Sequence, residues 1–177
     1  MKSTVPGFYI IQDIDFVKKQ KGEASFPQLQ KMLPEFDLSN ISSMKKYSTE
    51  QEILLIRSAC KLIYGDDSQA SWEKWGYHDF ETTRDSSLGK VFLTLFKNPK
   101  EVIINGGRMF AFFNPAIKFS HKQLSETSAS VYINNDPYPK EYFYGLFKGF
   151  LEHLVVKSTI KVEEIDPHTH IYTIAWK

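Results

Sequence analysis

The chain has 177 residues and a net charge of +1, with 42% hydrophobic and 24% charged residues. A chain of this length is typical of one globular domain whose core is stable without disulfide cross-links or bound metal ions. The near-zero charge and a set of only three arginines, Arg57, Arg84 and Arg108, argue against nucleic acid as a partner. The single cysteine, Cys60, excludes an intramolecular disulfide and a cysteine-rich zinc site. We therefore expect one domain over residues 1–177.

The first residues carry no membrane signal. Met1–Ile11 has one lysine and a short apolar run that Pro6-Gly7 interrupts. Such a segment is neither a signal peptide nor a membrane span. The sequence therefore predicts a cytoplasmic protein with no membrane partner.

Apolar residues at helical spacing fill most of the chain up to about residue 113. Ser48 and Gln51 have the spacing of a capping box, and Gly65 is a suitable stop for the helix that follows them. The segment Tyr77–Phe80 is aromatic and reads as either a bend or a continuing helix, and Asn105-Gly106-Gly107 as a kink or a point of close contact. Helices are predicted over Val5–Lys21, Phe26–Leu33, Thr49–Tyr64, Gln69–Trp75, Leu88–Phe96 and Lys100–Phe113, with a loop over Glu35–Met44.

The C-terminal part changes to strand patterns around one long helix. Thr127–Asn134 alternates apolar and polar residues with a period of two, and Ile117–Leu124 is its expected partner strand, with Ile117, Phe119 and His121 on one face. Ser158–Glu164 and His170–Trp176 are predicted to form a hairpin. The fold class is therefore α+β, with a helical N-terminal half followed by β-β-α-β-β and an antiparallel four-stranded sheet.

The helix predicted over Tyr138–Val156 has two different faces. One face is an apolar stripe expected to lie on the sheet: Phe143, Leu146, Phe147, Phe150, Leu151 and Leu154. The other carries Tyr142, Gly145, Gly149 and His153. Two interior glycines cost roughly 1 kcal/mol each against Ala in an exposed helix, so some gain elsewhere is expected to offset them. The glycine face is thus a shallow groove where a backbone, side chain or ligand of unknown identity approaches.

Several short motifs, together with this order of elements, resemble a known superfamily. It groups 4-vinyl-reductase-type domains with haem nitric-oxide-binding-type domains, and within it the chain looks most similar to the myxobacterial multi-copy family of unknown function. The resemblance covers most of the chain and implies a sensor or adaptor role. Its carrying residues are Ile14-Asp15-Phe16-Val17 with Gly22 and Phe26, Val131-Tyr132-Ile133 with Pro137-Tyr138-Pro139, Gly145 with Gly149, and Val162-Glu163-Glu164.

The chain departs from the superfamily where its members bind cofactors. The haem-binding members carry a histidine on the helix before the sheet and a Tyr-x-Ser-x-Arg motif for the propionates. Here Lys100–Phe113 contains no histidine, and the strand reads Tyr132-Ile-Asn-Asn-Asp136. The 4-vinyl-reductase-type members often carry a cysteine cluster, whereas this chain has only Cys60. We therefore expect no cofactor and no metal, with haem kept as an alternative.

A ligand site is predicted where aromatic residues meet the glycine face. Its candidate residues are Trp72, Trp75, Tyr77, Phe110, Phe112, Tyr142, Gly145, Gly149 and His153. Helix-spaced aromatic residues are also what an ordinary core contains, and His153 suits a partly buried histidine bonded to a carbonyl. Lys97, Lys100 and Arg108 form either a small basic rim or a solvated face. Asp166, His168 and His170 suit either a metal site or a polar hairpin turn.

These observations leave functions of different classes open. The first is a non-enzymatic sensor or adaptor that binds a small apolar ligand or a partner protein. The alternative is a haem-dependent sensor of NO or O2 with His121, His153 or His78 as an unusual axial ligand. An enzyme would need a pocket with two titratable groups of perturbed pKa, and no local catalytic motif is present. A homodimer through an exposed apolar helix face is also compatible with the sequence.

Overall fold

The structure is a computed structural model in which residues 3–177 are described. The chain divides into two compact units, one up to Ser71 and the other from Trp72 to Lys177. The second unit carries the sheet, and it is the unit of interest for function. Within the described residues, no helix combines the length and the hydrophobicity that crossing a bilayer requires. The single domain over residues 1–177 stays a prediction.

The first unit packs three helices beside a two-stranded sheet. Its elements are β1 (Thr4–Pro6), α1 (Gly7–Lys21), α2 (Ser25–Met32), a 3-10 turn (Leu38–Asn40), β2 (Lys46–Ser48) and α3 (Thr49–Tyr64). β1 and β2 pair antiparallel, with Val5 opposite Tyr47. The predicted start of the first helix at Val5 is therefore wrong. Pro6 is extended, with φ −64° and ψ 142°, and the helix begins at Gly7.

Local signals in the sequence fix both ends of α3. The Ser48 side chain accepts from Glu50 N at 3.1 Å, and Ser48 N donates to Gln51 Oε1 at 3.1 Å. The capping box is therefore confirmed. Gly65 follows the helix with φ 93°, a left-handed conformation that costs glycine little.

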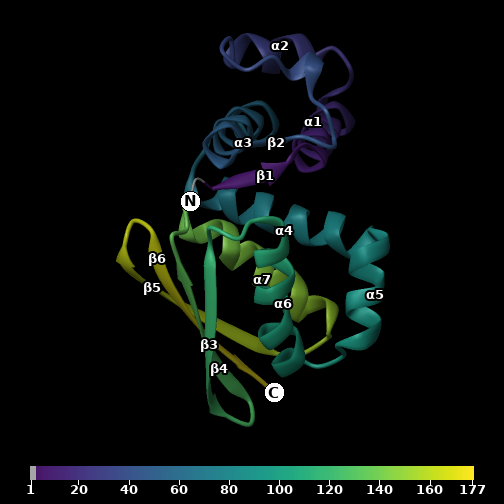
Figure 1. Ribbon diagram of the computed structural model, residues 1–177. Coiled ribbons are helices and arrows are strands. Elements are labelled where there is room, and N and C mark those ends of the chain that lie inside the picture. The colour runs from purple at the N-terminus through teal and green to yellow at the C-terminus, as the bar shows by residue number, and fades with distance from the viewer. Residues whose placement is uncertain (1–2) are drawn as a thin grey trace. The chain divides into compact units, whose positions relative to one another are not determined.

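The second unit contains the longer helices and the main sheet (Figure 1). The first turn of helix α4 precedes the boundary between the two units at Ser71. The helix continues through Tyr77–Phe80, so its predicted end at Trp75 is wrong. Of the two alternatives for Tyr77–Phe80, the continuing helix is confirmed. The elements are α4 (Gln69–Asp85), α5 (Ser87–Leu95), α6 (Pro99–Phe113), β3 (Lys118–Ser125), β4 (Ser128–Asn134), α7 (Lys140–His153), β5 (Ser158–Asp166) and β6 (Thr169–Trp176).

The main sheet has the predicted antiparallel topology. Its four strands lie in the order β3-β4-β6-β5, and every neighbouring pair is antiparallel. Figure 1 shows α6 and α7 on one face of this sheet. The predicted apolar face of β4 is buried at Ala129, Val131 and Ile133, but Ser130 on the opposite face is also buried, so the alternation of burial is incomplete. The α+β fold class with β-β-α-β-β is confirmed.

The apolar face of α7 lies on the sheet only in part, and its glycine face is filled. Phe143 and Phe147 contact Tyr172 of β6 as predicted. Leu146, Phe150 and Leu154 pack instead against Phe80, Phe92 and Val102 of helices α4, α5 and α6. A Cβ added to Gly145 would stand 2.0 Å from the carbonyl oxygen of Glu73 on α4, and one on Gly149 would stand 2.4 Å from the Phe80 ring. Helix α4 therefore occupies the groove that the sequence leaves open, and close approach of two helices is the gain that offsets the two glycines.

Candidate functional site

The residues predicted to bind a ligand do not line one pocket in the structure. Trp72 and Trp75 are buried side chains of α4, whereas Phe112 on α6 is 79% exposed. The Tyr77 hydroxyl donates to Glu152 Oε2 at 2.9 Å. Phe110 packs against Phe119 and Phe143, with ring centroids 5.1 Å apart in both pairs.

The remaining predicted residues lie along the contact between α4 and α7. The Tyr142 hydroxyl donates to Asp79 Oδ2 at 2.8 Å. Gly145 and Gly149 touch α4 directly, and the exposed His153 has its ring 5.9 Å from that of Phe80. Tyr142, Gly145 and Gly149 therefore form a packed helix contact, which is the ordinary core interpretation of these residues, whereas His153, expected to be partly buried, is exposed.

A cavity of about 300 Å³ lies instead between α6 and the strands β3 and β4. This volume is at the lower end of the range for small-molecule sites, about 300–1,000 Å³. The cavity is lined by Ile103, Ile104, Gly107, Arg108, Phe119, Ser120, His121 and Val131. We call it the α6–β3 pocket. Its lining combines apolar side chains with a guanidinium and an imidazole, a composition compatible with a small organic molecule.

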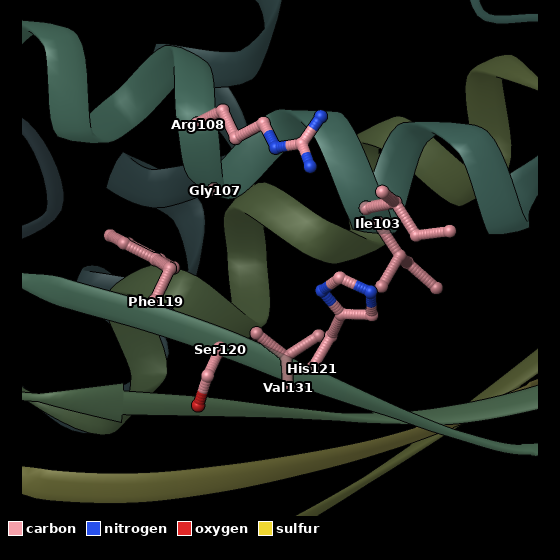
Figure 2. Close-up of a pocket in the computed structure, with 8 residues that line it drawn as sticks. Ile103, Gly107, Arg108, Phe119, Ser120, His121 and Val131 are labelled. Atoms are coloured by element: carbon pink, nitrogen blue, oxygen red, sulfur yellow. The ribbon is translucent and has the colours of Figure 1, made fainter.

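The geometry of the pocket follows from the register of the sheet. Phe119 pairs with Ile133 and His121 pairs with Val131, so these side chains stand on the face that α6 covers. The predicted common face of Phe119 and His121 is thereby confirmed. Figure 2 shows the His121 ring rising from the strand toward α6, and the Arg108 side chain extending from the helix over the same space. The Ser120 hydroxyl points away from both.

Helix α6 approaches β3 closely at one end of the pocket. A Cβ on Gly107 would stand 2.7 Å from Cβ of Phe119, whereas one on Gly106 would meet nothing within 4 Å. The predicted close contact is therefore at Gly107. The glycine sets the spacing of helix and strand, and the pocket opens beside it. The Gly106-Gly107 pair indicates a close contact, but the sequence does not indicate which strand the helix approaches.

Two carboxylates with raised pKa values lie outside the pocket. Burial raises the pKa of Asp79 to about 7, although the hydrogen bond from Tyr142 acts in the opposite direction. Burial also raises the pKa of Asp136, against the hydrogen bonds from His170 and from the backbone of Tyr138. Each carboxylate is bonded inside the second unit, so neither is in position to act on a molecule in the pocket.

The Asp136–His170 pair fastens the turn before α7 to strand β6. Asp136 is 0% exposed and His170 is 2% exposed. Asp136 Oδ2 lies 3.0 Å from His170 Nδ1. Asp136 Oδ1 also accepts from Tyr138 N at 2.9 Å. His170 thus faces inward, while Asp166 accepts from the backbone N–H of His168 at 2.7 Å. Asp166 and His168 thus belong to a polar hairpin turn, whereas His170 is a buried residue of β6. No group of three His, Cys, Asp or Glu residues placed to hold a metal ion occurs among the described residues.

Solved structures similar to this chain share one fold. The unliganded Fe(II) H-NOX protein from K. algicida is 16% identical, with a TM-score of 0.73 over 100% of this chain and 97% of its own. The H-NOX protein from S. oneidensis in the Fe(II)NO state is 14% identical, with a TM-score of 0.76 over 97% and 99%. An oxygen-binding H-NOX domain related to soluble guanylate cyclases is 11% identical, with a TM-score of 0.76 over 100% and 95%. The chain therefore has the H-NOX fold.

The residues present do not fit haem in the manner that the resemblance implies. Helix α6 carries no histidine, and the position of the motif arginine is taken by Asp136, a buried carboxylate bonded to His170. A carboxylate would repel a propionate rather than hold it. Beside the pocket, the rings of Phe110, Phe119 and Phe143 pack against one another between α6, β3 and α7, with centroids 5.1–5.5 Å apart.

Sequence comparison places the chain in a family. No curated protein resembles it closely enough in sequence to count as a match. A family profile with the description "Protein of unknown function (DUF2378)" matches residues 26–177, which is most of the chain. The chain belongs to this family, the DUF2378 family.

Proposed function

We propose that the chain is a non-enzymatic sensor or adaptor domain that binds a small, largely apolar ligand in the α6–β3 pocket. The observation that carries the proposal is the pocket itself, in which Ile103, Phe119 and Val131 provide an apolar floor beside Arg108 and His121. Similar folds are seen in proteins whose structures are described with bound NO or oxygen, which supports a sensing role.

The position of the pocket suits signalling through the sheet. A molecule lodged between α6 and β3 changes the spacing that Gly107 and Phe119 set. Phe119 in turn contacts Phe143 of α7, with ring centroids 5.5 Å apart. Occupancy at the pocket therefore reaches α7 through one aromatic contact. A partner protein, or a second copy of the chain, would respond to this change at α7.

The positions of the titratable groups support a non-enzymatic role. Asp79 and Asp136 have raised pKa values but are bonded to Tyr142 and His170 rather than directed at a ligand. A binding protein needs no proton transfer, and the pocket contains no carboxylate. We therefore propose binding without turnover.

Native mass spectrometry of the purified full-length chain tests this proposal. The expected result is a fraction of the protein that carries a small organic molecule and loses it when Val131→Trp fills the pocket. A matched control, Val91→Trp, adds the same bulk at an exposed position of α5. Ligand retention by Val131→Trp, with a fold unchanged by circular dichroism, would contradict the proposal.

The alternative function is a haem-dependent gas sensor with a non-standard axial ligand. One observation favours it: the His121 imidazole projects from β3 toward α6, beside a pocket (Figure 2). His78 and His153 are the other candidates, and His78 Nε2 lies 3.3 Å from the Thr82 hydroxyl.

Haem titration followed by absorption spectroscopy decides between the two functions. A Soret band that shifts on addition of the protein, and that is lost in one of the variants His121→Ala, His153→Ala or His78→Ala, would establish the alternative. No shift, or a shift that survives all three replacements, would eliminate it.

A further inference from the structure

Arg108 stands at the α6–β3 pocket without an internal counter-charge. Its Nη1 donates to Asn105 Oδ1 at 3.4 Å, a long hydrogen bond to a neutral amide. Among the residues that the structure describes, no carboxylate lies within ion-pairing distance of its guanidinium. The other arginine of this unit, Arg84, is paired with Asp85 at 2.8 Å. Arg108 thus has hydrogen-bonding capacity to spare.

The surroundings of the pocket are cationic or neutral throughout. None of the eight lining residues is acidic. Strand β3 contains Lys118 and Lys122 but no aspartate or glutamate. The acidic residue of α6, Glu101, is at the first turn of the helix, where its Oε2 accepts from the backbone N–H of Lys97 at 3.2 Å. An anion entering the pocket would therefore meet donors and no repelling carboxylate.

Donors and apolar side chains adjoin around this space, because Arg108 shares α6 with Ile103, and His121 of β3 pairs with Val131 of β4. Arg108 is on the helix and His121 is on the strand, and Figure 2 shows their polar ends on the same side of the sheet with the space between them. Ile103 and Val131 are 7% and 3% exposed and form the apolar wall. A ligand that matches this arrangement has one charged end and one hydrocarbon end.

We propose that the α6–β3 pocket takes a small organic monocarboxylate, with its carboxylate between Arg108 and His121 and its hydrocarbon part against Ile103, Phe119 and Val131. This inference rests on the proposed function, because it names the ligand class of the same pocket. A planar carboxylate matches the two parallel N–H groups of one guanidinium. A phosphate monoester would bring a second negative charge for which the lining offers no second fixed cation.

The test compares three probes of equal chain length on the full-length protein. Octanoate, 1-octanol and octylammonium are titrated by isothermal calorimetry, and each is repeated with Arg108→Gln, His121→Phe and the control Lys100→Gln. Lys100 is an exposed cation on the same helix that does not line the pocket. Circular dichroism checks that each variant is folded.

We expect octanoate to bind roughly tenfold more tightly than 1-octanol, because only the carboxylate forms charge-assisted hydrogen bonds with the protein. A tenfold ratio of affinities corresponds to about 1.4 kcal/mol of binding free energy. Arg108→Gln removes this preference, His121→Phe reduces it, and Lys100→Gln preserves it. Equal binding of octanoate and 1-octanol, or tighter binding of octylammonium, would overturn the carboxylate inference while leaving ligand binding intact. If none of the three probes bound but native mass spectrometry still showed a retained small molecule, the carboxylate inference alone would fail. If no probe bound and no small molecule was retained, both proposals would fail.

Discussion

The Tyr142 hydroxyl on α7 donates a hydrogen bond of 2.8 Å to Asp79 Oδ2 on α4. Burial raises the pKa of Asp79 from its ordinary value of 3.8 to about 7, even though this hydrogen bond favours the charged form. The contact between the two helices thus includes a carboxylate that is neutral at mildly acidic pH. The same contact brings the backbones together at Gly76 and Gly145.

Asp79 makes stability depend on pH in a direction opposite to that of most carboxylates. The unfolded chain releases the Asp79 proton near pH 3.8, and the folded chain keeps it until about pH 7. The folded state therefore binds more protons, and this site lowers the free energy of unfolding as pH rises through that window. We predict that Asp79→Asn gains stability over the parent chain between pH 5 and pH 8 in urea titrations. Parallel pH profiles of the two proteins would refute the prediction.

The Gly145 position admits no side chain. A Cβ there would stand 2.0 Å from the Glu73 carbonyl oxygen, which belongs to backbone and cannot rotate away. We predict that Gly145→Ala lowers the free energy of unfolding by about 3 kcal/mol, the upper part of the usual range for overpacking. The matched control is Gly106→Ala, where a Cβ meets nothing within 4 Å. It should be neutral or stabilise by up to about 1 kcal/mol, because alanine favours the helix. Equal effects of the two substitutions would show that α4 and α7 are not in backbone contact.

The Gly107–Phe119 contact sets the width of the pocket. A Cβ on Gly107 would stand 2.7 Å from Cβ of Phe119, so Gly107→Ala must move helix and strand apart. We predict that this variant changes octanoate affinity by about fivefold or more, for a loss of stability of roughly 1–3 kcal/mol. A double-mutant cycle with Phe119→Gly, which removes the contacting Cβ, measures the coupling by calorimetry and thermal unfolding. Strict additivity of the two substitutions would place the contact elsewhere.

The Asp136–His170 pair is expected to be structural. Asp136→Ala leaves His170 Nδ1 and the Tyr138 N–H without their acceptor in a buried site. We predict a loss of about 2–4 kcal/mol in denaturant unfolding, mostly from these unsatisfied groups. Asp166→Ala is the control, because Asp166 is exposed and accepts one N–H from His168, so its loss should be nearer 1 kcal/mol. A loss below 1 kcal/mol for Asp136→Ala would contradict the structural role.

The sequence predicted the fold where the signals were local and long. The capping box at Ser48 and the stop at Gly65 placed α3 at its observed ends. The period of two around Val131 placed β4, because one face of that strand is buried. β1 and β2 were missed because each has only three residues, which is too short to show a period.

The candidate site was harder to predict, because it depends on which elements meet. Gly76 resembles a helix breaker, so the helix was expected to end at Trp75. In the structure this glycine admits the Tyr142 carbonyl, which a sequence pattern cannot reveal. The glycine stripe of α7 was recognised, but its occupant, α4, was not. Arg108 and His121 were each noted alone, and only the pairing of α6 with β3 brings them to one pocket.

The central claim is that a small ligand binds between α6 and the sheet, and methyl NMR of the full-length chain tests it most directly. Isoleucine, leucine and valine methyl groups are labelled, and octanoate is added in steps. The account predicts shifts concentrated at Ile103, Ile104 and Val131, the methyl-bearing residues of the pocket. Shifts concentrated instead at the exposed Leu88, Val91 and Leu95 of α5, or at no methyl group at all, would contradict it.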